Sequence, residues 1–108
     1  MKYPEYELKI RLDKIFPSLP DTKIPSEDIM HRIASLPIYI RTQTCMEMGW
    51  DDAKYYRKVS GNVIMTLEEE KRFMEIASKA MKKYSDYVFN RYILPKRRVR
   101  KKAYKKFD

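Results

Sequence analysis

The chain has 108 residues, of which 44% are hydrophobic and 13% aromatic, so it can form one domain with a hydrophobic core and is not a wholly disordered chain. No apolar run approaches the roughly 18–20 residues that a membrane-spanning helix needs, and the first residues lack the apolar segment of an export signal. The formal net charge of +9 indicates attraction to polyanions.

Residues 1–25 are predicted to form an N-terminal arm or helix followed by a proline-rich connection. Across residues 4–16, the spacing of Leu8 and Leu12 favours a helix, whereas the alternation of apolar and polar residues that begins at Tyr6 leaves a strand open. The connection that follows is expected to be extended because of its prolines, Pro17, Pro20 and Pro25.

Residues 26–94 are predicted to form a helical domain. Ser26 is expected to cap its first helix, which should end at Leu36 because the residue before Pro37 is disfavoured in a helix. Residues 37–48 read as another helix, although the β-branched residues near its start leave a strand open.

Two capping patterns predict the next helices. Asp51 can cap a short helix that runs from residue 52 to about residue 60, where Gly61 is a natural left-handed stop. Thr66 and Glu69 form a capping box at the start of the longest helix, which is predicted to reach about Leu94. The apolar face of this helix contains Phe73, Ala77, Ala80, Tyr84 and Tyr87, and is widened by Met74, Met81, Val88 and Tyr92.

The chain has two glycines, Gly49 and Gly61, twelve residues apart, with one short predicted helix between them and another before Gly49. A helix, a tight turn that needs a positive φ and a second short helix make up a helix-turn-helix, here at residues 37–61. The predicted fold class is therefore all-α: a small helical bundle containing a helix-turn-helix, with a long C-terminal helix and a basic tail at residues 95–108.

Around Gly49, the size and polarity of the side chains also follow an order that is typical of helix-turn-helix motifs. A small residue precedes the glycine, apolar residues flank it, and a capping residue, a buried residue in mid-helix and a closing polar residue follow. In this sequence these are Cys45, Met48, Trp50, Asp51, Tyr55 and Ser60. With this order, residues 41–61 resemble the helix-turn-helix of the phage repressor and Cro family, and the resemblance covers roughly residues 26–80.

The resemblance implies that the second helix enters the major groove of duplex DNA. The residues that it places toward the groove or at its edge are Asp52, Ala53, Lys54, Tyr56 and Arg57. Arg57 is the best candidate for a base contact, because its fork of donors matches the acceptor pair on guanine. Trp50 and Tyr55 are expected to lie in the core.

The positive charge is concentrated near the C-terminus. Residues 1–65 carry 10 Lys/Arg and 9 Asp/Glu, whereas residues 96–108 alone carry eight Lys/Arg and one Asp. We expect these cations to contact nucleic-acid phosphates: Lys96, Arg97, Arg98, Arg100, Lys101, Lys102, Lys105 and Lys106. Tyr104 and Phe107 lie among them and could stack on exposed bases, so RNA stays open beside the preferred duplex DNA.

Signatures of catalysis are missing from the sequence. One histidine, His31, and one cysteine, Cys45, are too few for a zinc site, and two isolated glycines make no phosphate-binding loop. The lone thiol fits a reducing compartment. We therefore expect no enzyme activity, cofactor, metal or small-molecule substrate, and a location in the cytoplasm or within a nucleoprotein particle.

These observations predict a non-enzymatic DNA-binding regulator of transcription, of the phage or plasmid type. A homodimer through the helix at residues 66–94 would suit this function, since two DNA half-sites are bound by two recognition helices. Two alternatives stay open. One is a basic structural component of a ribosome or virion whose tail contacts RNA or packaged DNA, and the other is a helical protein-interaction module.

Overall fold

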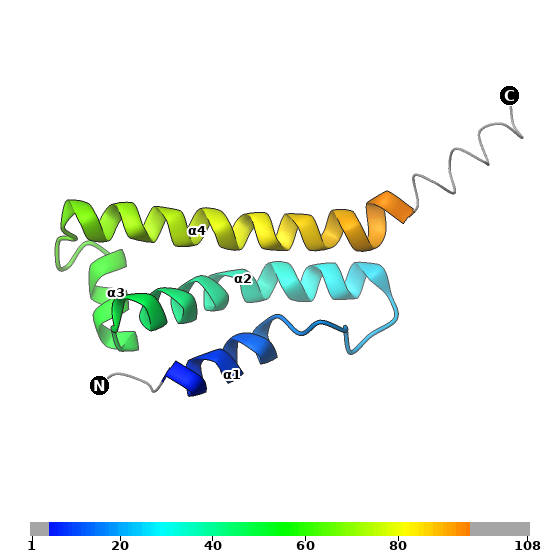
Figure 1. Cartoon of the computed structure of the whole chain (residues 1–108), viewed down its shortest axis with the longest axis horizontal. Coiled ribbons are helices and arrows are strands. Elements are labelled where there is room, and N and C mark those ends of the chain that lie inside the picture. Colours follow the sequence, from blue (N-terminus) through cyan, green and yellow to red (C-terminus); the bar gives the residue numbers. More distant parts are fainter. Residues whose placement is uncertain (1–4, 96–108) are drawn as a thin grey trace, which may run out of the picture.

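The computed structural model describes residues 5–95, and over this range the chain is a helical bundle without strands. Its elements are α1 (Glu5–Ile15), α2 (Pro25–Met48), α3 (Asp52–Val59), α4 (Leu67–Val88) and a π-helical turn, η1 (Phe89–Ile93). The helices α2 and α4 lie side by side, α1 packs along α2, and α3 lies across the end of the pair (Figure 1). The predicted all-α bundle with a long C-terminal helix is thus confirmed.

The first element, α1, is a helix rather than the alternative strand. Leu8 and Leu12 are buried, whereas Tyr6 and Ile10 are 70% and 51% exposed. The residues that seemed to alternate as in a strand therefore divide between the two faces of a helix, because residues four apart share a face.

The start of α2 differs from the prediction. The N-cap residue is Ile24, without a side-chain cap, and Pro25 occupies the first turn, so the expected cap at Ser26 was wrong. Proline suits this position because its fixed φ is helical and its missing N–H would have had no partner there. The hydroxyl of Thr22 accepts a hydrogen bond from the Ile24 N–H at 3.1 Å.

The predicted break at Leu36 was also wrong, because Pro37 lies inside one continuous helix. Residues 37–48 are helical as predicted, and the strand is excluded. An internal proline costs about 3 kcal/mol in a helix. Here its ring is exposed, and the neighbouring Ser35 and Tyr39 are buried on the opposite side, so packing of the flanking turns outweighs the local preference.

The predicted caps around α3 and α4 are confirmed. The carboxylate of Asp51 accepts from the Lys54 N–H at 2.8 Å. At the start of α4, Thr66 and Glu69 make both hydrogen bonds of the capping box, at 3.0 and 3.1 Å. Gly49 and Gly61 have φ values of 68° and 87°, a region that disfavours other residues.

The interior is divided into two clusters. The larger one joins α1, α2 and α4 through Leu12, Tyr39, Ala80 and Tyr84. The smaller one lies at the α3 end and contains Cys45, Trp50 and Tyr55. Trp50 and Tyr55 are 3% and 7% exposed, as expected of core residues.

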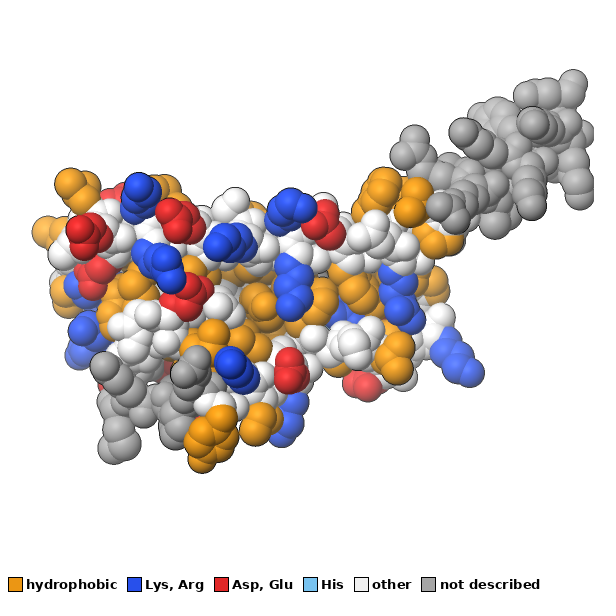
Figure 2. All heavy atoms as spheres, in the orientation of Figure 1, with side chains coloured by type: hydrophobic (Ala, Val, Ile, Leu, Met, Phe, Trp, Pro, Cys, Tyr) orange, Lys and Arg blue, Asp and Glu red, His pale blue; other side chains and the backbone are white. Residues whose placement is uncertain are grey.

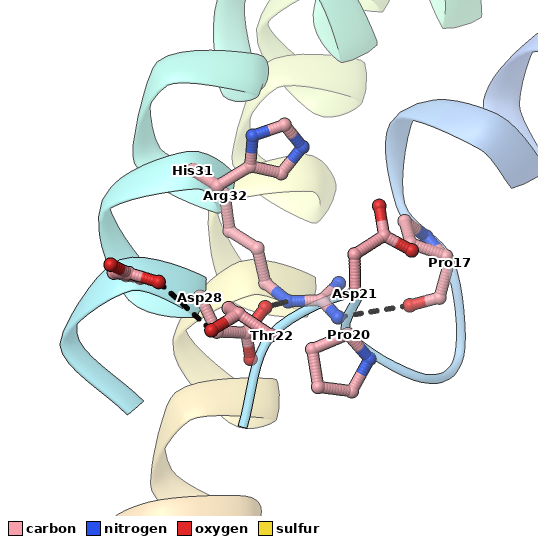
Figure 3. Close-up of a pocket in the computed structure, with 8 residues that line it drawn as sticks. Pro17, Pro20, Asp21, Thr22, Asp28, His31 and Arg32 are labelled. Carbon is pink, nitrogen blue, oxygen red and sulfur yellow. Dashed lines mark hydrogen bonds and ion pairs between the residues drawn. The ribbon is translucent and has the colours of Figure 1, made fainter. Parts of the chain in front are cut away.

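A buried ion pair fixes the other end of the bundle (Figure 3). Arg32 and Asp28 are 1% and 3% exposed, and Arg32 Nε donates to Asp28 Oδ1 at 2.9 Å. Arg32 Nη2 donates to the Pro17 carbonyl at 3.0 Å and to the Tyr87 hydroxyl at 2.8 Å. Tyr87 and Tyr92 both donate to Asp28 Oδ2. The pair therefore ties α2 to the connection after α1 and to the end of α4.

These contacts also set the protonation of the carboxyl group. Burial raises the pKa of Asp28, but the hydrogen bonds from Tyr92 and Tyr87 and the charge of Arg32 outweigh it, so the pKa is lowered. Burial, followed by the hydrogen bonds with Asp28 and Tyr92, raises the pKa of Tyr87 to about 12 against the opposing charge of Arg32. Asp28 is therefore a buried anion and Tyr87 a neutral donor at neutral pH.

Candidate nucleic-acid interface

The short helix α3 is held with one face inward and the other face in solvent. The turn at Gly49 reverses the chain, and Tyr55 packs inward beside Phe73 of α4, with 6.2 Å between ring centroids. At the other end of α3, Lys58 pairs with Glu69 at 2.9 Å and donates to the Ile64 carbonyl at 3.3 Å. Both ends of α3 are thus fixed to the bundle, which orients its outer face.

The structure brings the five predicted contact residues of α3 together on this outer side. Ala53, Lys54, Tyr56 and Arg57 are exposed, and Asp52 is partly buried. Ala53 and Arg57 are four residues apart and Ala53 and Tyr56 three apart, so all three share one face of the helix.

Arg41 of α2 is a further residue of this surface that the sequence did not single out. Its Nη1 donates to the Tyr56 hydroxyl at 2.5 Å, and its Nε lies 3.9 Å from Asp52 Oδ1. Desolvation lowers the pKa of Arg41, but Tyr56 and the charge of Asp52 outweigh it and raise the pKa. Because Arg41 and Tyr56 are fifteen residues apart and on different helices, no sequence pattern could have paired them.

Cys45 lies beneath this surface and is chemically inert. It is 2% exposed, and burial, followed by the nearby charge of Asp52, raises the pKa of its thiol to about 11. The thiol is thus a packing group in the smaller cluster rather than a nucleophile.

The inertness of Cys45 gives a direct test of the local packing. At pH 8 the folded protein is expected to react with a thiol reagent at least about 100-fold more slowly than the unfolded chain, because only the thiolate reacts. The measurement compares absorbance traces of disulfide exchange in buffer and in denaturant. Equal rates would contradict the burial of Cys45.

Several cations on the described surface are paired with carboxylates. Figure 2 shows Lys and Arg side chains along α4 interspersed with acidic ones. Lys82 pairs with Asp86 at 2.7 Å, and Arg72 pairs with Glu47 at 2.6 Å. The predicted contacts from Lys96 to Lys106 lie outside the described residues, and Pro95, which precedes them, is at the opposite end of α4 from α3 (Figure 1).

Residues 5–95 offer few side chains for a ligand-binding or metal-binding site. A cavity of about 260 Å³ lies beside Arg32, lined also by Pro20, Asp21 and the exposed His31 (Figure 3). The charged groups deepest in it, Asp28 and Arg32, are paired with each other. This part of the chain has no group of three His, Cys, Asp or Glu residues placed to hold a metal ion. None of its helices is long and apolar enough to cross a membrane.

Comparison of the chain with models of known protein families, with curated proteins and with solved structures found no match. The assignment of a function therefore depends on the residues themselves.

Proposed function

We propose that this chain is a nucleic-acid-binding protein that presents α3 to the major groove of duplex DNA and grips phosphates with residues 96–108. The observation that carries the proposal is the outer face of α3, where Ala53, Tyr56 and Arg57 are exposed together on a helix fixed at both ends. A helix that reads bases must be short, rigidly held and free on one side.

Affinity and discrimination come from different parts of the chain under this proposal. The face of α3 carries Lys54 and Arg57, which are partly offset by Asp52. The segment 96–108, with eight Lys/Arg and one Asp, provides most of the net charge. Phosphate contacts fix position and supply affinity, whereas base contacts supply sequence preference. We therefore assign affinity to residues 96–108 and discrimination to Arg57.

The test is to select bound sequences from a random duplex pool, and then to compare the Arg57→Ala variant with a matched control. Arg57→Ala is expected to reduce the preference for the selected duplex over random duplex by about 5- to 150-fold, the worth of one base contact. Lys79→Ala removes one exposed charge from α4. It should weaken binding to both duplexes slightly and equally. If Arg57→Ala also acts equally on both duplexes, α3 does not read sequence.

A specific observation favours a second candidate, a structural component of a nucleoprotein particle. The polar groups of Tyr56 and Asp52 already have a partner in Arg41, and Asp52 brings negative charge close to approaching phosphates. A component of this kind would bind duplex DNA and RNA without preference. Its binding would disappear on removal of residues 96–108, whereas a sequence preference that survives this removal supports the regulator.

A further inference from the structure

One side of α4 is apolar and is not covered by another helix within residues 5–95. Leu67, Met74 and Met81 are 86%, 57% and 52% exposed, and Val88 is partly exposed. These residues recur every seven positions and therefore form one stripe along the helix. Figure 1 shows α2 running alongside α4, and the two helices contact each other.

The stripe points away from the groove between α2 and α4. That groove is lined by Tyr39, Lys79 and Lys83. At about 100° per residue, Lys83 lies roughly 160° around the helix from Met81. The residues that accompany the stripe, Ser78 and Ser85, are small and exposed, which allows another helix to approach closely. An exposed apolar stripe of this length on a small protein marks an interaction surface.

We propose that the occupant of this stripe is a second copy of the chain, with its α4 antiparallel. A two-fold axis near Ala77 and Ser78 places Leu67 opposite Val88 of the second copy and Met74 opposite Met81 of the second copy. Every apolar residue of the stripe then meets an apolar residue, which is the self-complementarity that a two-fold interface requires.

The charges beside the stripe select this direction. Glu75 follows Met74 and Lys82 follows Met81 in the sequence, so both flank the stripe on the same side. In the antiparallel register, Glu75 therefore lies near Lys82 of the second copy, and the two-fold axis repeats this pair. In a parallel pair, Glu75 and Lys82 of the second copy would lie on opposite sides of the seam and could not pair. Exposed ion pairs contribute little to affinity, but they determine orientation. The Lys82–Asp86 pair within α4 does not prevent the contact between Glu75 and Lys82 of the second copy, because the Lys82 side chain is 76% exposed.

The size of the stripe sets the strength of the dimer. The 22 residues of α4 span about 33 Å at 1.5 Å per residue. A single helix seam of this length falls at the lower end of specific interfaces. We therefore expect a reversible dimer whose population increases with concentration.

The dimer would also complete the proposed nucleic-acid interface, a consequence that rests on the proposed function. Within one chain, about 40 Å of helix separates the start of α4, beside α3, from Pro95. In the antiparallel pair, the end of one α4 lies beside the start of the other. Each α3 would then lie near Pro95 of the second copy, after which the basic residues follow in the sequence. The starts of the two α4 helices would be about 32 Å apart, close to one turn of duplex DNA.

Cysteine crosslinking tests the register without nucleic acid, so its outcome is independent of the proposed function. Ser78→Cys places two thiols beside the two-fold axis, whereas the matched control Ser85→Cys, on the same exposed side, places them about 22 Å apart. Under mild oxidation, Ser78→Cys is expected to form a disulfide-linked dimer at least 10-fold faster than Ser85→Cys. Native Cys45 is buried and gives the background.

Light scattering across a dilution series completes the test. The wild-type mass is expected to approach twice the chain mass with increasing concentration, and Met81→Glu should remain a monomer. Glu75→Lys and Lys82→Glu should each weaken the dimer, and the double variant should restore it. Equal crosslinking of the two cysteine variants, or a wild-type monomer at all concentrations, would overturn the proposal.

Discussion

Replacing Asp28 with asparagine is expected to lower the free energy of unfolding by about 3–5 kcal/mol, the usual cost of breaking a buried ion pair. The substitution keeps the shape of the side chain but leaves the Arg32 charge, 1% exposed, without a counterion. The Nη1 atom of Arg32 has no hydrogen-bond partner, and the groups that Nη2 contacts, the Pro17 carbonyl and the Tyr87 hydroxyl, are uncharged. Urea unfolding followed by circular dichroism measures the effect.

Asp86→Asn is the matched control for this prediction. Lys82 and Asp86 are also four residues apart on a helix, but their side chains are 76% and 54% exposed. Loss of such an exposed pair changes stability by at most about 1 kcal/mol. If the two asparagine variants unfold at the same urea concentration, the buried pair does not hold the end of the bundle together.

The pH dependence of the Asp28→Asn effect follows from the direction of the pKa shift. The folded state lowers the pKa of Asp28, so its contribution to stability is present above the unfolded value of about 4. It is lost as the pH falls through the folded pKa. The difference in stability between wild type and Asp28→Asn should therefore be constant near pH 7 and decrease in acid.

The second large effect concerns salt. If the eight Lys/Arg of residues 96–108 all meet phosphates, affinity for duplex DNA is expected to fall about 10⁴-fold between 50 and 200 mM salt. The physical reason is the release of condensed counterions from DNA, which becomes less favourable as the salt concentration rises. Fluorescence anisotropy with a labelled duplex measures the slope.

Two sets of variants identify which residues cause the dependence of DNA affinity on salt concentration. Replacing the eight cations with glutamine should remove most of the salt dependence. Replacing Tyr104 and Phe107 with alanine keeps the charge and should leave the duplex slope unchanged, while weakening binding to single strands if these rings stack on bases. A slope that persists in the glutamine variant would mean that cations elsewhere carry the binding.

The sequence predicted best those features that depend on neighbours along the chain. The Asp51 cap, the Thr66–Glu69 capping box and the positive φ of Gly49 were all predictable, because each arises within one helical turn. Pro37 was misjudged because its local preference was overridden by the packing of Ser35 and Tyr39, which the sequence does not show.

In the candidate site, too, features within α3 could be predicted from the sequence, whereas contacts between helices could not. Arg57 is exposed and Tyr55 is buried, as the resemblance of residues 41–61 to a helix-turn-helix implied. The contact between Arg41 and Tyr56 joins two helices and depends on the angle between them. Likewise, the predicted apolar face of α4 was broader than the part covered by α2, so Met74 and Met81 remained exposed.

Because the interior is divided into two clusters, the α3 end of the bundle is a packing unit of its own. Cys45, Trp50 and Tyr55 pack without contributions from Leu12 or Tyr84, the centre of the larger cluster. Segments with their own small core open independently of the rest of a fold, so amides of α3 should exchange with solvent before those of the α2–α4 pair. The outer residues of α3 can consequently diversify, in nature or by grafting, while the scaffold beneath them remains unchanged.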